Sequence, residues 1–418
     1  MELITKQGAA LSLPKGYKQT EVGLIPEDWK LKTLGDVGDV QMCKRIFSYQ
    51  TSKRGDVPFF KIGTFGKEPD AFIDWDLYQE FRKKYSFPKK GYLLISASGT
   101  IGRTVEYLGE DAYYQDSNII WIDNDEKLIS NKYLNYTLKV IKYNTEGSTI
   151  KRLYNSIIKS SKFVIPPTLT EQKAIATALS DIDALIANLE QTITKKKAIK
   201  QGAMQQLLTP PHKGGKRLPG FSGDWVEKTL GEVAEFYKGK GLPKSEISDD
   251  GKFKCLHYGE LFTKYNELID DVRSRTNFND GSFMSKANDV LMPTSDVTPN
   301  GLATASVLFE NDVILGGDVL VIRPNKSELF GGFLSYLVTI NKQQILTLIS
   351  GSTVYHLYGS DMAKFGFYLP RIVEQKAIVQ ILSDMDAEIT QLESKKEKYQ
   401  AIKQGMMQEL LTGKTRLI

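Results

Sequence analysis

Residues 171–209, EQKAIATALSDIDALIANLEQTITKKKAIKQGAMQQLLT, occur a second time without a gap as residues 374–412, EQKAIVQILSDMDAEITQLESKKEKYQAIKQGMMQELLT. The two copies are identical at 24 of 39 positions, which excludes chance and indicates an internal duplication. This repeat decides the fold, because the two copies must adopt closely similar structures.

Apolar side chains recur in each copy at alternating steps of four and three residues, which is the spacing of a coiled-coil seam. The first seam is Ile175, Leu179, Ile182, Ile186, Leu189 and Ile193, and the second is Ile378, Leu382, Met385, Ile389 and Leu392. Lys396 follows where an apolar residue would continue, so we expect the packing to be interrupted there. Thr168 and Glu171 have the spacing of a capping box, whereas the second copy has Arg371 in place of the threonine.

A helix of this length, roughly 58 Å at 1.5 Å per residue, needs a partner to bury its seam. We expect the partner to be the other copy, in an antiparallel pair that would hold two domains apart. The alternative is that each helix packs on its own domain. The lysine runs 195–197 and 395–396 are interpreted as solvated helix faces rather than as a DNA-binding surface.

Two further pairs of repeats show that the duplication covers the whole chain. Asp28-Trp29 in IPEDWKLKTLGDV recurs as Asp224-Trp225 in FSGDWVEKTLGEV, and GSTIKRLYNS from Gly147 recurs as GSTVYHLYGS from Gly351. Each half therefore consists of a start block, a divergent middle, a Gly-Ser-Thr block and a long helix. The recurring tryptophans are interpreted as buried anchors of the two domain starts.

The divergent middles, residues 38–146 and 234–350, contain short apolar runs typical of strands, at 92–96, 118–122 and 319–322. We predict an α+β protein with two mixed, strand-rich domains in a pseudo-twofold repeat, separated by two long helices forming an antiparallel coiled coil. The expected boundaries are domain 1 at 1–165, the first helix at 166–209, a Pro- and Gly-rich linker at 210–220, domain 2 at 221–366 and the second helix at 367–418.

The composition is that of an ordinary globular protein, with 41% hydrophobic and 25% charged residues in a chain of 418. The net charge of +5 permits nucleic-acid binding without requiring it. We expect a cytoplasmic protein, because no apolar run approaches the roughly 20 residues that span a bilayer and the N-terminus lacks a signal-peptide core. Cys43 and Cys255 are too few for a disulfide framework or a zinc cluster and are expected to be reduced thiols.

Motifs of enzymes that act on DNA are missing from the sequence. It has no Asn-Pro-Pro-aromatic motif of an adenine methyltransferase, no Walker loop, and only three histidines, none at metal-ligand spacing from another. We therefore expect a non-catalytic chain that binds neither a cofactor nor a metal itself. The alternatives are a fused methyltransferase and recognition enzyme, and a coiled-coil scaffold that binds only proteins.

The start block EVGLIPEDWKLKTLGD, the SGTIG loop at 98–102, the Gly-Ser-Thr block and IPPTLTEQKAI before the first helix resemble the specificity subunits of type I restriction-modification systems. The resemblance covers the whole chain, in order and in duplicate. It implies two target-recognition domains that each read one part of an asymmetric, bipartite DNA site, with the helices as spacer. It also implies docking of two adenine-methyltransferase (modification) subunits and, through them, restriction and translocase subunits, with S-adenosylmethionine, ATP and Mg held by those partners.

Side chains that could reach base edges or phosphates should lie in loops of each domain. In domain 1 the candidates are Lys44, Arg45, Lys61, Ser98, Thr100, Arg103, Lys151 and Arg152. In domain 2 they are Lys238, Lys240, His257, Tyr258, Thr294, Ser295, Thr298, Tyr355 and His356. His257 is expected at the position that corresponds to Lys61, and either histidine could instead have a purely structural role. Gly99 and Gly102 would let the backbone approach a phosphate closely.

Overall fold

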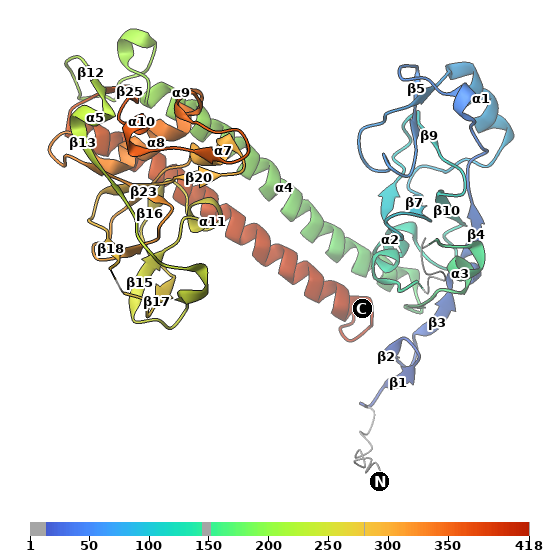
Figure 1. Ribbon diagram of the computed structural model, residues 1–418. Helices are drawn as coiled ribbons and strands as arrows, with labels where there is room; N and C mark the ends of the chain where they lie inside the picture. Colours follow the sequence, from blue (N-terminus) through green and yellow to red (C-terminus); the bar gives the residue numbers. More distant parts are fainter. Residues whose placement is uncertain (1–13, 144–151, 280, 418) are drawn as a thin grey trace. The chain divides into compact units, whose positions relative to one another are not determined.

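The structure is a computed structural model that describes residues 14–143, 152–279 and 281–417. The chain divides into two compact units (Figure 1). Unit 1 comprises residues 1–188 and 395–418, and unit 2 comprises residues 189–394. Unit 1 is therefore discontinuous in sequence, and the long helices contribute to both units.

Unit 1 is built from mainly antiparallel sheets over two apolar cores. Its main sheet has the order β4 (Gly38–Gln41), β10 (Ile119–Asn124), β7 (Leu93–Ser96) and β8 (Thr104–Glu106). A second sheet has the order β6 (Phe72–Ile73), β5 (Val57–Phe60) and β9 (Tyr113–Tyr114). Two smaller pairs are β1 (Tyr17–Thr20) with β2 (Gly23–Pro26) and β3 (Lys30–Thr33) with β11 (Lys162–Ile165). The short helices are α1 (Trp75–Lys84), α2 (Asn131–Val140) and α3 (Asn155–Ser160), with 3-10 turns η1 (Leu34–Asp36) and η2 (Ser48–Gln50).

Unit 2 repeats this plan with more strands. Its main sheet has the order β13 (Ala234–Lys238), β23 (Val319–Pro324), β19 (Asp289–Pro293), β21 (Ser306–Leu308) and β16 (Leu268–Ile269). The second sheet has the order β14 (Ile247–Ser248), β17 (Arg275–Thr276), β15 (Phe253–Leu256), β22 (Ile314–Leu315) and β18 (Phe283–Met284). Two-stranded pairs are β12 (Val226–Thr229) with β25 (Gly366–Leu369) and β20 (Ser295–Asp296) with β24 (Tyr355–His356). The short helices are α5 (Leu230–Val233), α6 (Glu260–Thr263), α7 (Pro299–Leu302), α8 (Gly331–Ile340), α9 (Lys342–Leu348) and α10 (Gly359–Met362), with 3-10 turns η3 (Pro211–Lys213) and η4 (Lys244–Glu246).

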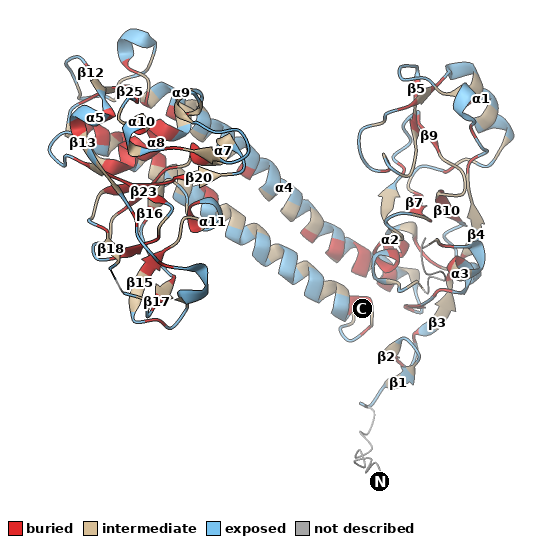
Figure 2. Cartoon of the chain, viewed as in Figure 1, coloured by how far each residue is buried: buried red, intermediate tan, exposed pale blue. Residues whose placement is uncertain are grey.

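The duplication extends into the middles, although these share little sequence. The first four strands of each main sheet correspond, β4-β10-β7-β8 to β13-β23-β19-β21, and a ten-residue helix follows the central strand in both units. The predicted strands at 92–96, 118–122 and 319–322 are confirmed as β7, β10 and β23. The start-block tryptophans are buried, Trp29 at 0% and Trp225 at 4% exposure, as predicted for domain anchors. Figure 2 shows buried residues in the bodies of both units and on parts of the long helices.

The repeated segments form α4 (Leu169–Leu207) and α11 (Ile372–Leu410), each 39 residues long. Within unit 2, Lys196 pairs with Glu388 at 2.6 Å and Lys197 with Glu393 at 2.7 Å. Two lysines interpreted as merely solvated thus bind the other long helix. The predicted seam residues are all buried or half-buried, and α11 continues past the half-buried Lys396.

A repeated cluster holds the helix pair against the body of each unit. In unit 1, Asp183 of α4 accepts a hydrogen bond from the Tyr136 hydroxyl at 2.8 Å and pairs with Lys403 of α11 at 2.5 Å. In unit 2, Asp386 of α11 accepts from the Tyr336 hydroxyl at 2.6 Å and pairs with Lys200 of α4 at 2.6 Å. Within unit 2, the partner on α11 falls from Glu388 to Asp386 as α4 rises from Lys196 to Lys200, which is antiparallel packing.

The capping box predicted at the start of α4 is only half formed. The Thr168 hydroxyl accepts from the Glu171 N–H at 3.2 Å, which is half of the box. The Glu171 carboxylate instead binds the Arg416 guanidinium, which also holds both carboxylate oxygens of Asp28 at 3.0 Å. Unit 2 repeats this contact between Arg217 and Glu374, 2.7 Å apart.

The segment 210–220, interpreted from sequence as a linker, lies against unit 2. The Lys216 N–H of this segment donates a hydrogen bond to the Gln206 carbonyl of α4 at 2.8 Å. His212 makes an edge contact with the Tyr368 ring at 4.9 Å, and the Lys213 ammonium lies 4.3 Å from the centre of that ring. Proline and glycine therefore shape a packed turn here.

Candidate DNA interface

In unit 1 the predicted residues gather around the turn Gln115–Asn118, which connects β9 to β10. Arg45 Nε donates to Asp116 Oδ2 at 2.8 Å, and the Ser98 hydroxyl donates to Asn118 Oδ1 at 2.8 Å. Arg152 Nη2 donates to the Ser117 carbonyl at 3.3 Å. Three candidates far apart in sequence thus meet at one edge of the main sheet.

The segment after the Gly-Ser-Thr block folds back onto the SGTIG loop. Ser98 and Arg152 form an antiparallel β-bridge, and the Leu153 N–H donates to the Ala97 carbonyl at 2.8 Å. The bridge explains why the two motifs occur together, since each fixes the backbone of the other. Lys151, the neighbouring candidate, lies outside the described residues.

The other described candidates of unit 1 have different surroundings. Lys61 is paired with Asp70 at 2.8 Å, and its side chain is 41% exposed. The Arg103 guanidinium donates to the Gly66 carbonyl at 3.2 Å, which occupies one of its five N–H donors. The Lys44 ammonium lies 5.2 Å from the centre of the Tyr85 ring, and Thr100 is exposed.

Gly99 and Gly102 differ in how much space surrounds the position of a Cβ atom. Both lie in the left-handed region, with φ of 66° at Gly99 and 78° at Gly102. A Cβ at Gly102 would meet Tyr143 Cε2 at 2.9 Å, whereas one at Gly99 would meet only Ile62 Cγ1 at 3.6 Å. Packing therefore accounts for Gly102, while Gly99 leaves an open approach to the backbone, as the phosphate hypothesis requires.

Unit 2 builds the same arrangement from different side chains. Ser295 pairs with His356 and Asp296 with Tyr355 in the ladder of β20 and β24, and the Leu357 N–H donates to the Thr294 carbonyl at 3.0 Å. The candidates from the 294–298 loop and from the Gly-Ser-Thr block are therefore neighbours, as in unit 1.

The turn Gly316–Asp318 in unit 2 corresponds to Gln115–Asn118. The Thr294 N–H donates to the Asp318 carbonyl at 3.0 Å, just as the Ala97 N–H donates to the Asn118 carbonyl at 2.8 Å. Lys238 pairs with Asp318 at 3.6 Å, with its side chain 63% exposed. Lys240 is exposed, and Thr298 is also exposed with its hydroxyl on Asp296 at 3.0 Å.

The strand register confirms the correspondence of His257 with Lys61. Leu256 pairs in parallel with Leu315, and Phe60 pairs in parallel with Tyr114, so the next residue leaves the sheet at the same point in both units. His257 Nδ1 accepts from the Gly259 N–H at 3.3 Å, and its ring lies 4.6 Å from that of Tyr258. Burial lowers the pKa of His257, so the ring is neutral at pH 7.

Sequence reasoning missed the two central turns. Their signal is a short polar stretch between apolar pairs, YYQDSNII at 113–120 and ILGGDVLV at 314–321, at the same place in each half. Ser117 has a φ of 61°, unusual for a residue other than glycine. Such backbone strain is often found at functional sites.

The arrangement offers exposed cations, hydroxyls and amides, which is the chemistry of base and phosphate recognition. Among the described residues, no three His, Cys, Asp or Glu side chains gather to hold a metal ion. The described helices also include none with the length and hydropathy to cross a membrane. Cys43 and Cys255 are both buried free thiols, and burial raises the pKa of Cys255 to about 11.

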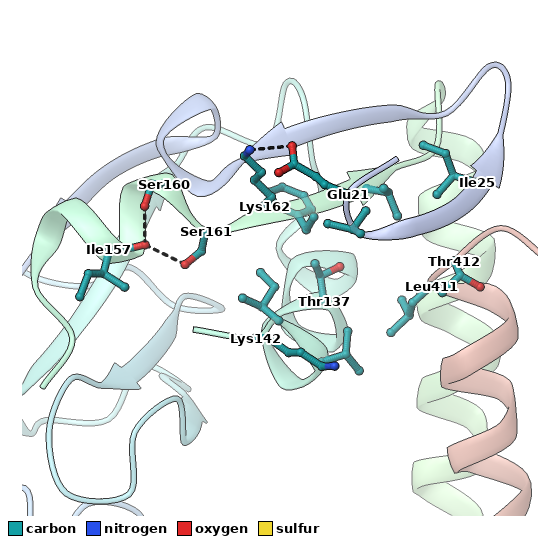
Figure 3. Close-up of a pocket in the computed structure, with 15 residues that line it drawn as sticks. Glu21, Ile25, Thr137, Lys142, Ile157, Ser160, Ser161, Lys162, Leu411 and Thr412 are labelled. Carbon is teal, nitrogen blue, oxygen red and sulfur yellow. Dashed lines mark hydrogen bonds and ion pairs between the residues drawn. The ribbon is translucent and has the colours of Figure 1, made fainter. Parts of the chain in front are cut away.

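A cavity of about 760 Å³ in unit 1 lies apart from the candidate residues (Figure 3). Its walls are mixed, with the apolar Ile25 and Leu411 on one side and the Glu21–Lys162 ion pair, 2.6 Å, at another. The corresponding recess of unit 2 is lined in part by Pro210 and Lys213 of the packed turn. None of the described candidate DNA residues lines either cavity.

Comparison with known proteins places these observations in a family. The model of the type I restriction modification DNA specificity domain matches twice, over residues 26–201 and 222–404. A putative type I restriction enzyme specificity subunit of Haemophilus influenzae is 55% identical over 176 residues, an alignment that spans 42% of this chain and 46% of that protein. A putative type I restriction enzyme specificity subunit (MjaX) of Methanocaldococcus jannaschii is 26% identical over 96% of this chain and 97% of its own length.

A solved structure shows the same fold. The S subunit of a type I restriction-modification system from M. genitalium superposes with a TM-score of 0.59 at 17% identity, covering 92% of this chain and 96% of that one. At this identity the likeness concerns the fold alone.

Proposed function

This chain belongs to the type I restriction modification DNA specificity family, with one copy of the family domain in each half, and from that premise we propose that units 1 and 2 each read one part of a split, asymmetric DNA site. The chain is the specificity subunit of a type I restriction-modification system, and its two family domains are target-recognition domains. The proposal concerns which loops read the DNA and what the site looks like.

One observation carries the proposal: the two units place different side chains on the same backbone frame. Around the central turns, Ser98 and Ser295 correspond to each other, and each pairs with a different residue, Arg152 in unit 1 and His356 in unit 2. A shared frame with different donors and acceptors is what two readers of different base sequences require. Arginine favours bidentate contacts to guanine, whereas a histidine ring presents only its two nitrogens.

The proposed partners are double-stranded DNA and two modification subunits, with restriction subunits joining through these. A duplicated chain presents each surface twice, which supports two copies of one partner. The chemistry of methyl transfer to adenine, with S-adenosylmethionine, and of ATP- and Mg-dependent translocation is assigned to those partners. This chain contributes recognition and no catalytic step, and the proposed compartment is the cytoplasm, where its DNA would be.

Methylation mapping of host DNA tests the proposal. We expect one split methyladenine motif, two specified parts around a fixed gap, to be present with the gene and absent after its deletion. The control is complementation with the intact gene, which should restore the same motif. An unsplit motif, or no change while the partner subunits are expressed, would contradict the proposal.

A chimaera separates the two readers. Exchanging residues 38–146 for the middle of a relative should change one part of the motif and leave the other part and the gap unchanged. The matched exchange of residues 234–350 should change only the other part. A chimaera in which both parts change would mean that the units do not read independently.

A further inference from the structure

The segment Lys44–Arg54 of unit 1 exposes two aromatic side chains to water. Phe47 is 51% and Tyr49 82% exposed. Their rings are stacked, with centroids 5.7 Å apart and planes 8° from parallel. Aromatic rings normally contribute by burial, so a stacked pair held in water indicates a surface that is covered during function.

The backbone of this segment is fixed rather than loosely attached. Cys43 and Ile46 are buried in a core of unit 1, at 2% and 9% exposure, and anchor its start. The Phe47 N–H donates to Gln50 Oε1 at 3.0 Å, and the Gln50 N–H returns to the Phe47 carbonyl at 2.9 Å. The Thr51 hydroxyl donates to the Ser48 carbonyl at 2.9 Å. The rings are therefore presented on a preorganised turn, which lowers the entropy cost of binding.

The charge around the Phe47 and Tyr49 rings indicates which class of partner fits this surface. The segment contains Lys44, Arg45, Lys53 and Arg54 and no acidic residue, and all four cations are exposed. The cores of protein–protein interfaces are depleted of charge, whereas DNA attracts cations to its phosphates. Charge complementarity thus favours DNA over a protein surface.

The position of the segment agrees with this choice. Arg45 contacts the central turn through Asp116, so the segment leaves the candidate DNA interface directly. Phe47 and Tyr49 follow within four residues, which places them within about 14 Å of Arg45 along the chain. By the strand register, unit 2 has Pro243 and Ser245 where unit 1 has Phe47 and Tyr49, while its buried Leu242 corresponds to Ile46.

We propose that Phe47 and Tyr49 form an aromatic wedge that packs against the bases at a locally unstacked step in the part of the DNA site read by unit 1. The proposal deepens the proposed function and rests on it. Apolar side chains inserted between base steps deform DNA in other proteins, and aromatic faces stack on bases regardless of base identity. The wedge would therefore select for a deformable step and leave base reading to the neighbouring polar side chains.

The test uses the chain assembled with its modification subunits and a duplex carrying the split site found by methylation mapping. The variant Phe47→Ala/Tyr49→Ala should bind this duplex ten- to hundredfold more weakly than the native chain. With 2-aminopurine placed in turn at each position of the part read by unit 1, the native complex should show raised fluorescence at one position other than the methylated adenine. The double variant should abolish that signal.

Two further variants control the result. Tyr49→Phe keeps both rings and should bind as the native chain does. Leu108→Ala removes an apolar side chain that is 65% exposed in the same unit but beside Glu106 and Glu110, and it should leave binding unchanged. Because Tyr49 is almost fully exposed, Tyr49→Ser tests the wedge if the double variant folds poorly.

Each other outcome overturns the inference. If the double variant keeps native affinity and the 2-aminopurine signal is unchanged, the wedge hypothesis is refuted while the proposed function stands. Loss of the modification subunits with unchanged DNA affinity of the remaining chain would show that the rings dock a protein. Failure of the native complex to bind the mapped site would refute the proposed function and the wedge together.

Discussion

Replacing Arg416 by alanine should destabilise unit 1, although the residue lies more than 200 positions from its partners Glu171 and Asp28 in sequence. The guanidinium lies between Glu171, at the start of α4, and Asp28, in the start block. Its Nη2 is 2.9 Å from Glu171 Oε2 and its Nη1 is 3.0 Å from Asp28 Oδ1. The Glu171 side chain is 4% exposed, so without the arginine a carboxylate remains buried and unpaired.

Removing one partner of a buried ion pair costs about 3–5 kcal/mol. The lower end applies here, because the Arg416 side chain is 24% exposed and water partly solvates the ion pair. For a unit of this size each kcal/mol shifts the midpoint by about 2–4 °C, so Arg416→Ala should lower the Tm of unit 1 by about 6–12 °C. Differential scanning calorimetry of the purified chain measures this shift.

Matched variants separate the buried pair from surface charge. Lys414→Ala removes a neighbouring cation whose side chain is 54% exposed, and should cost less than about 0.5 kcal/mol. Arg416→Leu combined with Glu171→Leu should recover much of the loss, since no charge is then left buried. The reasoning is refuted if Arg416→Ala costs no more than Lys414→Ala.

Three other predictions concern the candidate interface. Arg45→Ala should weaken DNA binding of the complex and reduce the slope of log affinity against log salt by about 0.9, as a phosphate contact requires, and an unchanged slope in a salt titration would exclude that role. Because burial lowers the pKa of His257 from its ordinary value of 6.5, the unfolded chain binds its proton more readily, so stability should fall as pH drops below 6.5. Denaturant titrations should show a smaller fall in His257→Gln, and an identical pH profile would contradict the assignment. Gly102→Ala should cost more stability than Gly99→Ala, because a residue with positive φ costs about 1–2 kcal/mol at either position but only at Gly102 does the new Cβ also meet the Tyr143 ring. Gly99→Ala should mainly weaken DNA binding, and equal effects of the two variants in melting and binding assays would contradict the distinction.

The sequence predicted the duplicated parts of the fold well, because repetition doubles each signal. The heptad spacing from Ile175 and from Ile378 led to two 39-residue helices, and the recurring Trp29 and Trp225 led to two buried domain starts. Local chemistry was less well predicted. The capping box at Thr168 is only half formed, because an arginine remote in sequence competes for the Glu171 carboxylate.

The candidate interface was predicted only in part, for a related reason. The motifs pointed to Ser98 and Arg152, but not to the turn Gln115–Asn118 that joins them, since nothing in either motif specifies its partner across the sheet. The stacked rings of Phe47 and Tyr49 also escaped notice. A sequence shows that a side chain is aromatic, but its exposure depends on neighbours brought together by the fold.

The composition of unit 1 from residues 1–188 and 395–418 has a consequence for how the chain is made on the ribosome. Unit 2 is continuous, so every contact within it becomes available as soon as residue 394 has emerged from the exit tunnel. Unit 1 must wait for Lys403 and Arg416, and its contact between Tyr17 and Gly413 joins residues 396 positions apart. The nascent protein therefore finishes its second reader before its first. Until then the core of unit 1 lacks Leu410 and Leu411, and the apolar surface left exposed is what chaperones cover in unfinished molecules.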